Sequence, residues 1–73
     1  MKVIQSPNSS NVGSVVYYPE HNLLIVEFKK GGVYSYKNVN AEMYHQLEQA
    51  ESVGSYIAKH IKSNKVCVCQ KLN

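Results

Sequence analysis

Apolar and polar residues alternate along the first half of the chain, which is the pattern of half-buried β-strands. The clearest run is 23–28, where one face carries Leu24, Val26 and Phe28. A stretch rich in β-branched and aromatic residues at 14–18 precedes it and stops at Pro19, which cannot donate to a sheet ladder. The Lys-Lys-Gly-Gly turn at 29–32 leads into a third alternating run at 33–36. The sequence therefore predicts a three-stranded antiparallel β-meander.

Beyond Asn40 the apolar period changes from two to that of a helix. One helical face is formed by Met43, Tyr44, Leu47 and Ala50, and Asn40 can cap its start. Gly54 interrupts this pattern, and a second short helix follows with the face Val53, Tyr56, Ile57, His60 and Ile61. Residues 65–72 return to alternation. The expected fold class is α+β: the three-stranded meander packed against two short helices, extended by a fourth, C-terminal strand.

The chain divides into a lead and a domain. Turn-forming residues crowd positions 6–11, so a flexible lead is expected over residues 1–11 and a single domain over 12–73. A chain of 73 residues buries only ~60–65% of its unfolded surface, so a homo-oligomer is expected to supply further stability. Apolar runs stay far short of the ~18 residues of a membrane span. The expectation is a soluble, cytoplasmic protein with no membrane contact.

The charged residues narrow the classes of ligand. Eight lysines oppose five glutamates, there is no Arg or Asp, and the formal net charge is +3. Lysine acts as a point charge, whereas arginine supplies the planar fork that reads guanine edges. The absence of arginine therefore argues against sequence-specific recognition of duplex DNA. An extended RNA would need many phosphate contacts, and this chain can offer few.

The sequence shows little sign of the residue patterns that catalysis or metal binding requires. The five carboxylates, Glu20, Glu27, Glu42, Glu48 and Glu51, form no evident acid–base pair, and no nucleophile elbow is present. Cys67 and Cys69 are separated by one residue, which is too close for a zinc knuckle, and the three histidines fall on separate elements. The sequence predicts a non-enzymatic protein with no metal and no cofactor, in which both cysteines pack as small apolar residues.

The six tyrosines hold most of the aromatic surface. Tyr44 and Tyr56 are expected to pack in the core. Tyr34 and Tyr36 share one face of a strand close to Lys29, Lys30 and Lys37. Rings that stack on bases beside ammonium groups that bind phosphate are what a nucleotide ligand requires. Packing of one of these two rings in the core is an equally good interpretation, and both stay open here.

The start of the second helix is a further candidate for anion binding. Backbone amides at a helix start, serine hydroxyls and a glycine can hold an anion. The residues concerned are Ser52, Gly54, Ser55, Tyr56, Lys59 and Lys62. A plain capped turn between two helices explains the serines and the glycine slightly better, and the nearby lysines keep the anion-binding interpretation open.

The order of strand and helix motifs from about Ser9 to Lys62 resembles that of the KTSC domain. The motifs that carry the resemblance are Leu24-x-Val26-x-Phe28, Gly32-x-Tyr34-x-Tyr36, Ala50-x-Ser52-x-Gly54-x-Tyr56 and Ile61-Lys62. The family takes its name from the C-terminus of some lysyl-tRNA synthetases, and the resemblance implies RNA binding or, as in small phage-encoded proteins, sequestration of a nucleotide signal. Ala58 and Lys62 stand where the family commonly has Asn and Arg, so roles of that Asn or of an Arg fork are not carried over.

Three functions remain as hypotheses. The first is a non-catalytic module that captures a nucleotide-type anion, such as a cyclic nucleotide signal, through the tyrosines and lysines named above. The second is an RNA- or tRNA-binding module. The third is a protein-interaction adaptor that uses the exposed face of the sheet and needs none of the basic groups. The compact chain favours the first, because a small ligand requires only one cavity.

Overall fold

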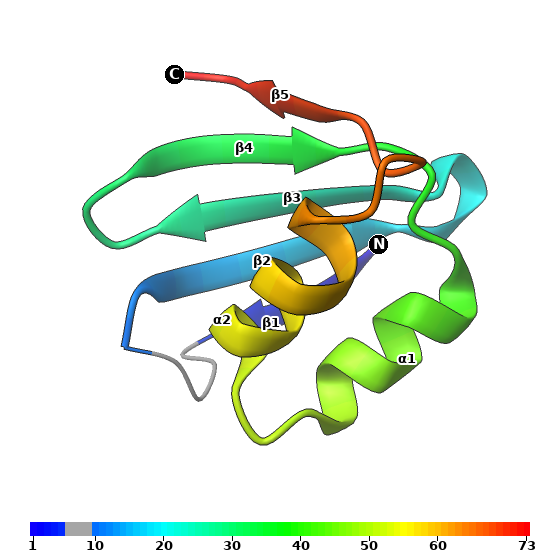
Figure 1. Cartoon of the computed structure of the whole chain (residues 1–73), viewed down its shortest axis with the longest axis horizontal. Helices are drawn as coiled ribbons and strands as arrows, with labels where there is room; N and C mark the ends of the chain where they lie inside the picture. The colour runs from blue at the N-terminus through cyan, green and yellow to red at the C-terminus, as the bar shows by residue number, and fades with distance from the viewer. Residues whose placement is uncertain (6–9) are drawn as a thin grey trace.

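The computed structural model describes residues 1–5 and 10–73, which form a five-stranded antiparallel sheet with helices on one face (Figure 1). The strands pair in chain order and are β1 (Lys2–Gln5), β2 (Val12–Tyr18), β3 (Leu23–Phe28), β4 (Gly32–Tyr36) and β5 (Cys69–Lys71). The meander predicted from the sequence is the centre of this sheet, β2 to β4. The α+β class and the antiparallel sheet are therefore confirmed, with two strands more than the meander alone.

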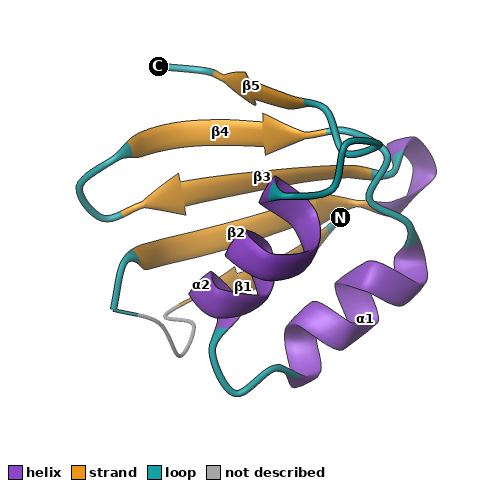
Figure 2. Ribbon diagram, in the orientation of Figure 1, coloured by secondary structure: helices purple, strands orange, loops and turns teal. Residues whose placement is uncertain are grey.

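Two helical segments cover the sheet on the same side (Figure 2). Helix α1 (Ala41–Gln49) begins where the sequence predicts, because the Asn40 side chain accepts a hydrogen bond from the Met43 amide at 2.9 Å. Helix α2 (Val53–Tyr56) runs directly into a π-helical segment, η2 (Ile57–Lys62). A short 3₁₀ turn, η1 (Pro19–His21), joins β2 to β3. In the part of the chain that the structure describes, no helix combines the length and apolar character needed to cross a membrane.

Both outer strands differ from the sequence prediction. The sequence predicts no strand before Val12, whereas β1 pairs with β2 through Ile4 opposite Val15, and Ile4 packs against the core. Residues 6–9 of the expected lead lie outside the described residues. The fourth predicted strand is shorter than 65–72, because Asn64 holds a turn by accepting hydrogen bonds from the Cys67 amide, at 3.1 Å, and the Val66 amide, at 3.0 Å.

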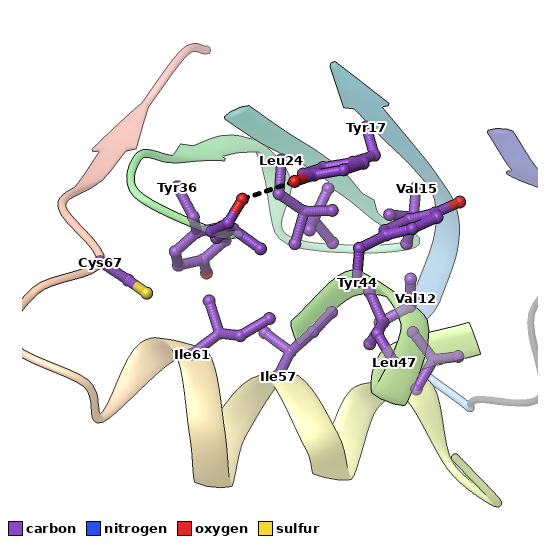
Figure 3. Packing of buried hydrophobic residues seen from close by; sticks show 13 residues of the cluster. Val12, Val15, Tyr17, Leu24, Tyr36, Tyr44, Leu47, Ile57, Ile61 and Cys67 are labelled. Atoms are coloured by element: carbon purple, nitrogen blue, oxygen red, sulfur yellow. Dashed lines mark hydrogen bonds between the residues drawn. The ribbon is translucent and has the colours of Figure 1, made fainter. Parts of the chain in front are cut away.

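The core lies between the helices and one face of the sheet. Its buried members are Val12, Val15, Tyr17, Leu24, Val26, Tyr36, Val39, Tyr44, Leu47, Val53, Ile57, Ile61 and Cys67. At its centre the rings of Tyr17 and Tyr44 stack with centroids 4.4 Å apart and planes 8° apart. The Tyr17 hydroxyl donates to the Val39 carbonyl at 2.7 Å, shown by the dashed line in Figure 3. This pair joins β2, α1 and the segment between β4 and α1.

The two stacked tyrosines are expected to respond differently to loss of their hydroxyls. Tyr17→Phe should lower the free energy of unfolding by about 1–2 kcal/mol, because the buried Val39 carbonyl loses its partner. Tyr44→Phe should be neutral or stabilising, since the Tyr44 hydroxyl is buried without a hydrogen-bond partner among the described residues. Urea unfolding of both variants measures the difference. Equal losses of stability would contradict this account of the core.

Candidate functional site

A cavity of about 500 Å³ opens on the helix-covered side of the sheet, beyond the buried core. We call it the ring–lysine cavity, and it is lined by Asn11, Phe28, Lys30, Gly31, Tyr34, Tyr36, Lys62 and Cys69. Its volume falls within the range of roughly 300–1,000 Å³ that is typical of small-molecule sites. Its lining comes from the β3–β4 hairpin, the start of β5, the end of η2 and the residue before β2, so segments distant in the sequence assemble it.

The β3–β4 hairpin sets the positions of the rings. Side chains alternate along β4, so Tyr34 and Tyr36 both face the helix-covered side. Phe28 lies on the same side of β3, and its ring meets the Tyr34 ring edge to face, with centroids 5.6 Å apart and planes 78° apart. The hairpin turns at Gly32, whose φ of 86° favours glycine, and a Cβ there would lie 2.8 Å from the Asn73 carbonyl oxygen.

Tyr36 is the most buried of the three rings, with 1% of its surface exposed. Burial, followed by the neighbouring Cys69 thiol, raises the pKa of Tyr36 to about 12. Its hydroxyl is therefore neutral at physiological pH and serves as a hydrogen-bonding group, not as a base. Tyr34 is half-buried, and its ring is the more accessible of the two. Core packing therefore holds for Tyr36, although it also lines the cavity, and Tyr34 stays the candidate for ligand contact.

Two lysines give the cavity a positive charge. Lys30 comes from the β3–β4 turn, and Lys62 is the last residue of η2, where a cation also faces the negative end of the helix dipole. The described lining residues include no carboxylate. The cavity therefore combines aromatic surface with a net positive charge, which suits a planar ligand that carries negative groups.

The structure brings four of the predicted site residues together and separates the others. Lys30, Tyr34, Tyr36 and Lys62 line the ring–lysine cavity. A second cavity, of about 330 Å³, contains four more of the predicted residues: Ser52, Ser55, Tyr56 and Lys59. The rest of its lining is Ala50, Glu51 and His60. Lys29, Lys37 and Gly54 line neither of these two cavities. Lys37 directly follows β4, and its amide donates to the Val68 carbonyl. Because side chains alternate along a strand, the Lys37 side chain lies on the face of the sheet opposite to Tyr36.

The turn at the start of α2 has the hydrogen bonds of a helix cap. The Ser52 hydroxyl accepts from the Ser55 amide at 3.3 Å, and the Ser52 carbonyl accepts from the Tyr56 amide at 3.0 Å. The Tyr56 hydroxyl donates to Gln46 on α1 at 2.8 Å. Glu51 adds a negative charge to this lining. The second cavity is therefore a weaker candidate for an anion than the ring–lysine cavity.

Four further residues line the cavity although the sequence does not mark them as site residues: Asn11, Phe28, Gly31 and Cys69. Phe28 could have been found, because its strand face is the face that Tyr34 extends. Cys69 and Asn11 reach the cavity through pairing of distant segments, β5 with β4 and β2 with β3, and no local pattern encodes that.

The buried tyrosines predict a loss of stability in alkaline solution. Burial raises the pKa of Tyr17, Tyr36 and Tyr44 above the ordinary value of 10.0, to about 12 for Tyr36. Because the unfolded chain releases these protons first, stability is retained below pH 10 and falls as pH rises toward 12. The Tyr36 contribution is on the order of 2–3 kcal/mol at pH 12. Melting curves between pH 8 and 12 measure it.

Tyr36→Phe supplies the control for this pH dependence. The variant lacks the ionising hydroxyl, so its melting temperature should fall less steeply than that of the wild type across the same range of pH. Equal slopes for the two proteins would mean that Tyr36 ionises as readily in the folded chain as in the unfolded one.

Comparison with known proteins places this architecture in a family. The model of the KTSC domain matches residues 8–64. A crystal structure of a KTSC domain protein from Yersinia pestis superposes with a TM-score of 0.84 and 26% sequence identity, covering 99% of this chain and 100% of that one. A protein of Stutzerimonas stutzeri, described as uncharacterized, is 37% identical over 54 residues, which are 74% of this chain and 76% of that protein.

Proposed function

The chain belongs to the KTSC domain family, and we propose that on this fold it is a non-catalytic binding module whose ring–lysine cavity captures a small nucleotide-type anion. One observation carries the proposal. Three aromatic rings and two lysines converge on a cavity of about 500 Å³ whose described lining holds no carboxylate. A neutral or cationic ligand would gain nothing from the lysines, and an anion without a planar part would gain little from the rings.

Each part of the lining has a role toward such a ligand. The half-buried Tyr34 ring, held edge to face by Phe28, offers a surface on which a base can stack, and stacking contributes about 1–3 kcal/mol per base. Lys30 and Lys62 neutralise phosphate as point charges, which hold phosphate with less directional demand than an arginine fork. The Tyr36 ring, which is 1% exposed, adds apolar surface to the lining from the side of the core.

The number of cations favours a small ligand over an extended nucleic acid. Non-specific RNA binding draws its free energy from many phosphate contacts. The cavity presents two lysines, and a mononucleotide or small cyclic nucleotide needs few more. RNA binding remains the alternative that the experiment below separates by its dependence on salt.

Calorimetry and thermal shift against cyclic nucleotides, linear nucleotides and short RNAs, each at two salt concentrations, test the proposal. We expect a small nucleotide to bind with a shallow dependence on salt. Tight binding of RNA with a steep dependence would favour the RNA-binding module instead. Absence of binding across the whole panel would contradict the proposal and favour the adaptor.

Replacing the accessible ring gives a sharper test of where the ligand binds. Tyr34→Leu keeps an apolar side chain against Phe28 but removes the stacking surface, so affinity for the nucleotide should fall by about 5- to 100-fold. Tyr18→Leu is the matched control, because Tyr18 is also half-buried but lies on the opposite face of the sheet. Isothermal titration of both variants measures the effect, and equal losses would place the ligand elsewhere.

A further inference from the structure

Strand β5 forms one edge of the sheet, and its outer side is exposed along Cys69–Lys71 (Figure 1). The Val68 carbonyl accepts from the Lys37 amide at 2.9 Å, and the Leu72 amide donates to the Val33 carbonyl at 2.7 Å. In an antiparallel pair every second residue bonds to the neighbouring strand. Residues 68, 70 and 72 therefore bond toward β4. The amides and carbonyls of Cys69 and Lys71 point away from the sheet.

We propose that β5 pairs antiparallel with β5 of a second copy of this chain, about a twofold axis at Gln70. In this register the outward groups of Cys69 face those of the partner's Lys71, and the same pair recurs across the axis. The outward amides and carbonyls are thus satisfied by each other, and the two sheets join into one continuous sheet. No lysine lies directly opposite another lysine, so like charges do not oppose the pairing.

The side chains favour this register over its neighbours. Val68 and Leu72 are 52% and 48% exposed and project on the face opposite to the cavity. With the axis at Gln70, Val68 lies opposite the partner's Leu72, so both apolar side chains of each copy find an apolar neighbour. Moving the axis to Cys69 places Val68 opposite the partner's Gln70, and moving it to Lys71 places Leu72 opposite the partner's Gln70. The exposed apolar residues and the open backbone groups therefore select the same arrangement.

Pairing of β5 with β5 of a second copy is favoured over pairing of β5 with β1 of another copy. Pairing β5 with β1 of another copy is a heterologous contact, and such contacts generate rings or open filaments. Pairing β5 with β5 uses the same surface twice and closes at two copies. A domain of 73 residues also gains stability from a partner, because its own core is small.

The pairing also brings a lysine of the second copy to the ring–lysine cavity. A role for this lysine in ligand binding rests on the proposed function, whereas the pairing itself does not. Cys69 lines the cavity, and Lys71 is in register with Tyr34 on the same face of the sheet. Across the twofold axis the partner's Lys71 lies beside Cys69. Each cavity thereby gains a third ammonium group at its edge from the second copy.

The mass in solution of the full chain and two variants tests the pairing. We expect the wild type to sediment at twice its 8.2 kDa mass. Lys71→Pro should be monomeric, because proline lacks the outward amide while the bonds from Gln70 and Leu72 to β4 are kept. Lys71→Gln, which retains the amide, should remain dimeric. A monomeric wild type, or a folded Lys71→Pro that keeps the dimer mass, overturns the proposal.

Disulfide trapping tests the register and does not depend on whether Lys71→Pro folds. In a Cys69→Ser background, Gln70→Cys should cross-link rapidly on oxidation, because the Cα atoms of a non-hydrogen-bonded pair lie about 4.5 Å apart. Leu72→Cys should not, since its counterpart lies roughly 14 Å away along the strands. Equal cross-linking of the two overturns the register. Rapid cross-linking of Gln70→Cys, together with a wild-type chain that binds no nucleotide, would contradict the proposed function and leave the pairing intact.

Discussion

Reversing the charge of both cavity lysines, Lys30→Glu together with Lys62→Glu, is expected to lower the affinity for the nucleotide by about 100- to 1,000-fold. Each reversal replaces an attraction of roughly 1 kcal/mol in a water-exposed setting by a repulsion of similar size. Two reversals therefore change the binding free energy by about 4 kcal/mol, and each 1.4 kcal/mol corresponds to a factor of ten. Calorimetry at low and at moderate salt measures the loss, which salt should reduce.

The matched control reverses two lysines outside the ring–lysine cavity. Lys37→Glu with Lys65→Glu lowers the formal net charge of +3 by the same four units as the cavity variant does. Its affinity should change much less, because the reversed charges are not part of the lining. If both double variants lose affinity equally, the ligand responds to the overall charge of the protein and not to this cavity.

Tyr44→Ala is expected to reduce the free energy of unfolding by about 3–5 kcal/mol, the range for removing a buried aromatic ring. The ring stacks on Tyr17 and joins α1 to the sheet. A chain of 73 residues has a total stability of about 4–11 kcal/mol, so the variant should be largely unfolded at moderately raised temperature. Thermal and urea unfolding followed by circular dichroism measure the effect.

His45→Ala provides the comparison on the same helix. His45 is exposed, so its replacement should change stability by no more than about 0.5 kcal/mol. Tyr44→Phe keeps the ring and removes only the hydroxyl, so this variant should be as stable as the wild type. If Tyr44→Ala were as stable as the wild type, the stacked tyrosine pair could not be the centre of the core.

The centre of the fold could be predicted from the sequence because its determinants are local. The alternation in 23–28 and 33–36 and the intervening Gly-Gly turn specify the β3–β4 hairpin. Asn40 marks the start of α1, and the change to helical spacing marks its buried face. Leu24 and Val26 are fully buried, as the pattern predicts.

The edges of the sheet could not be predicted in the same way. Strands β1 and β5 have four and three residues, too few for a clear period of two. Each is a strand because a distant partner offers bonding groups, as β2 does for Ile4 and β4 for Gln70. The spacing of Ile57 and Ile61, which are both buried, predicts a helix here but does not distinguish the π-helical form of η2 from an α-helix.

Only part of the candidate site could be predicted from the sequence. Composition and strand period point to Lys30, Tyr34 and Tyr36. Lys62 is predicted as a partner of the turn at the start of the second helix, whereas the structure places it in the ring–lysine cavity. The sequence could not decide how deeply each tyrosine is buried. In the structure both line the cavity, with Tyr36 almost fully buried and Tyr34 half-buried. Cys69 joined the site only through the pairing of β5 with β4.

The most direct test of the central claim is a nuclear magnetic resonance titration that observes both the backbone amides and the aromatic rings. The titrant is the nucleotide that binds most tightly in calorimetry. The account predicts that the largest shift changes fall on the rings of Phe28 and Tyr34 and on the amides of Lys30 and Lys62. Changes confined to the opposite face of the sheet, around Tyr18 and Ile25, would contradict it.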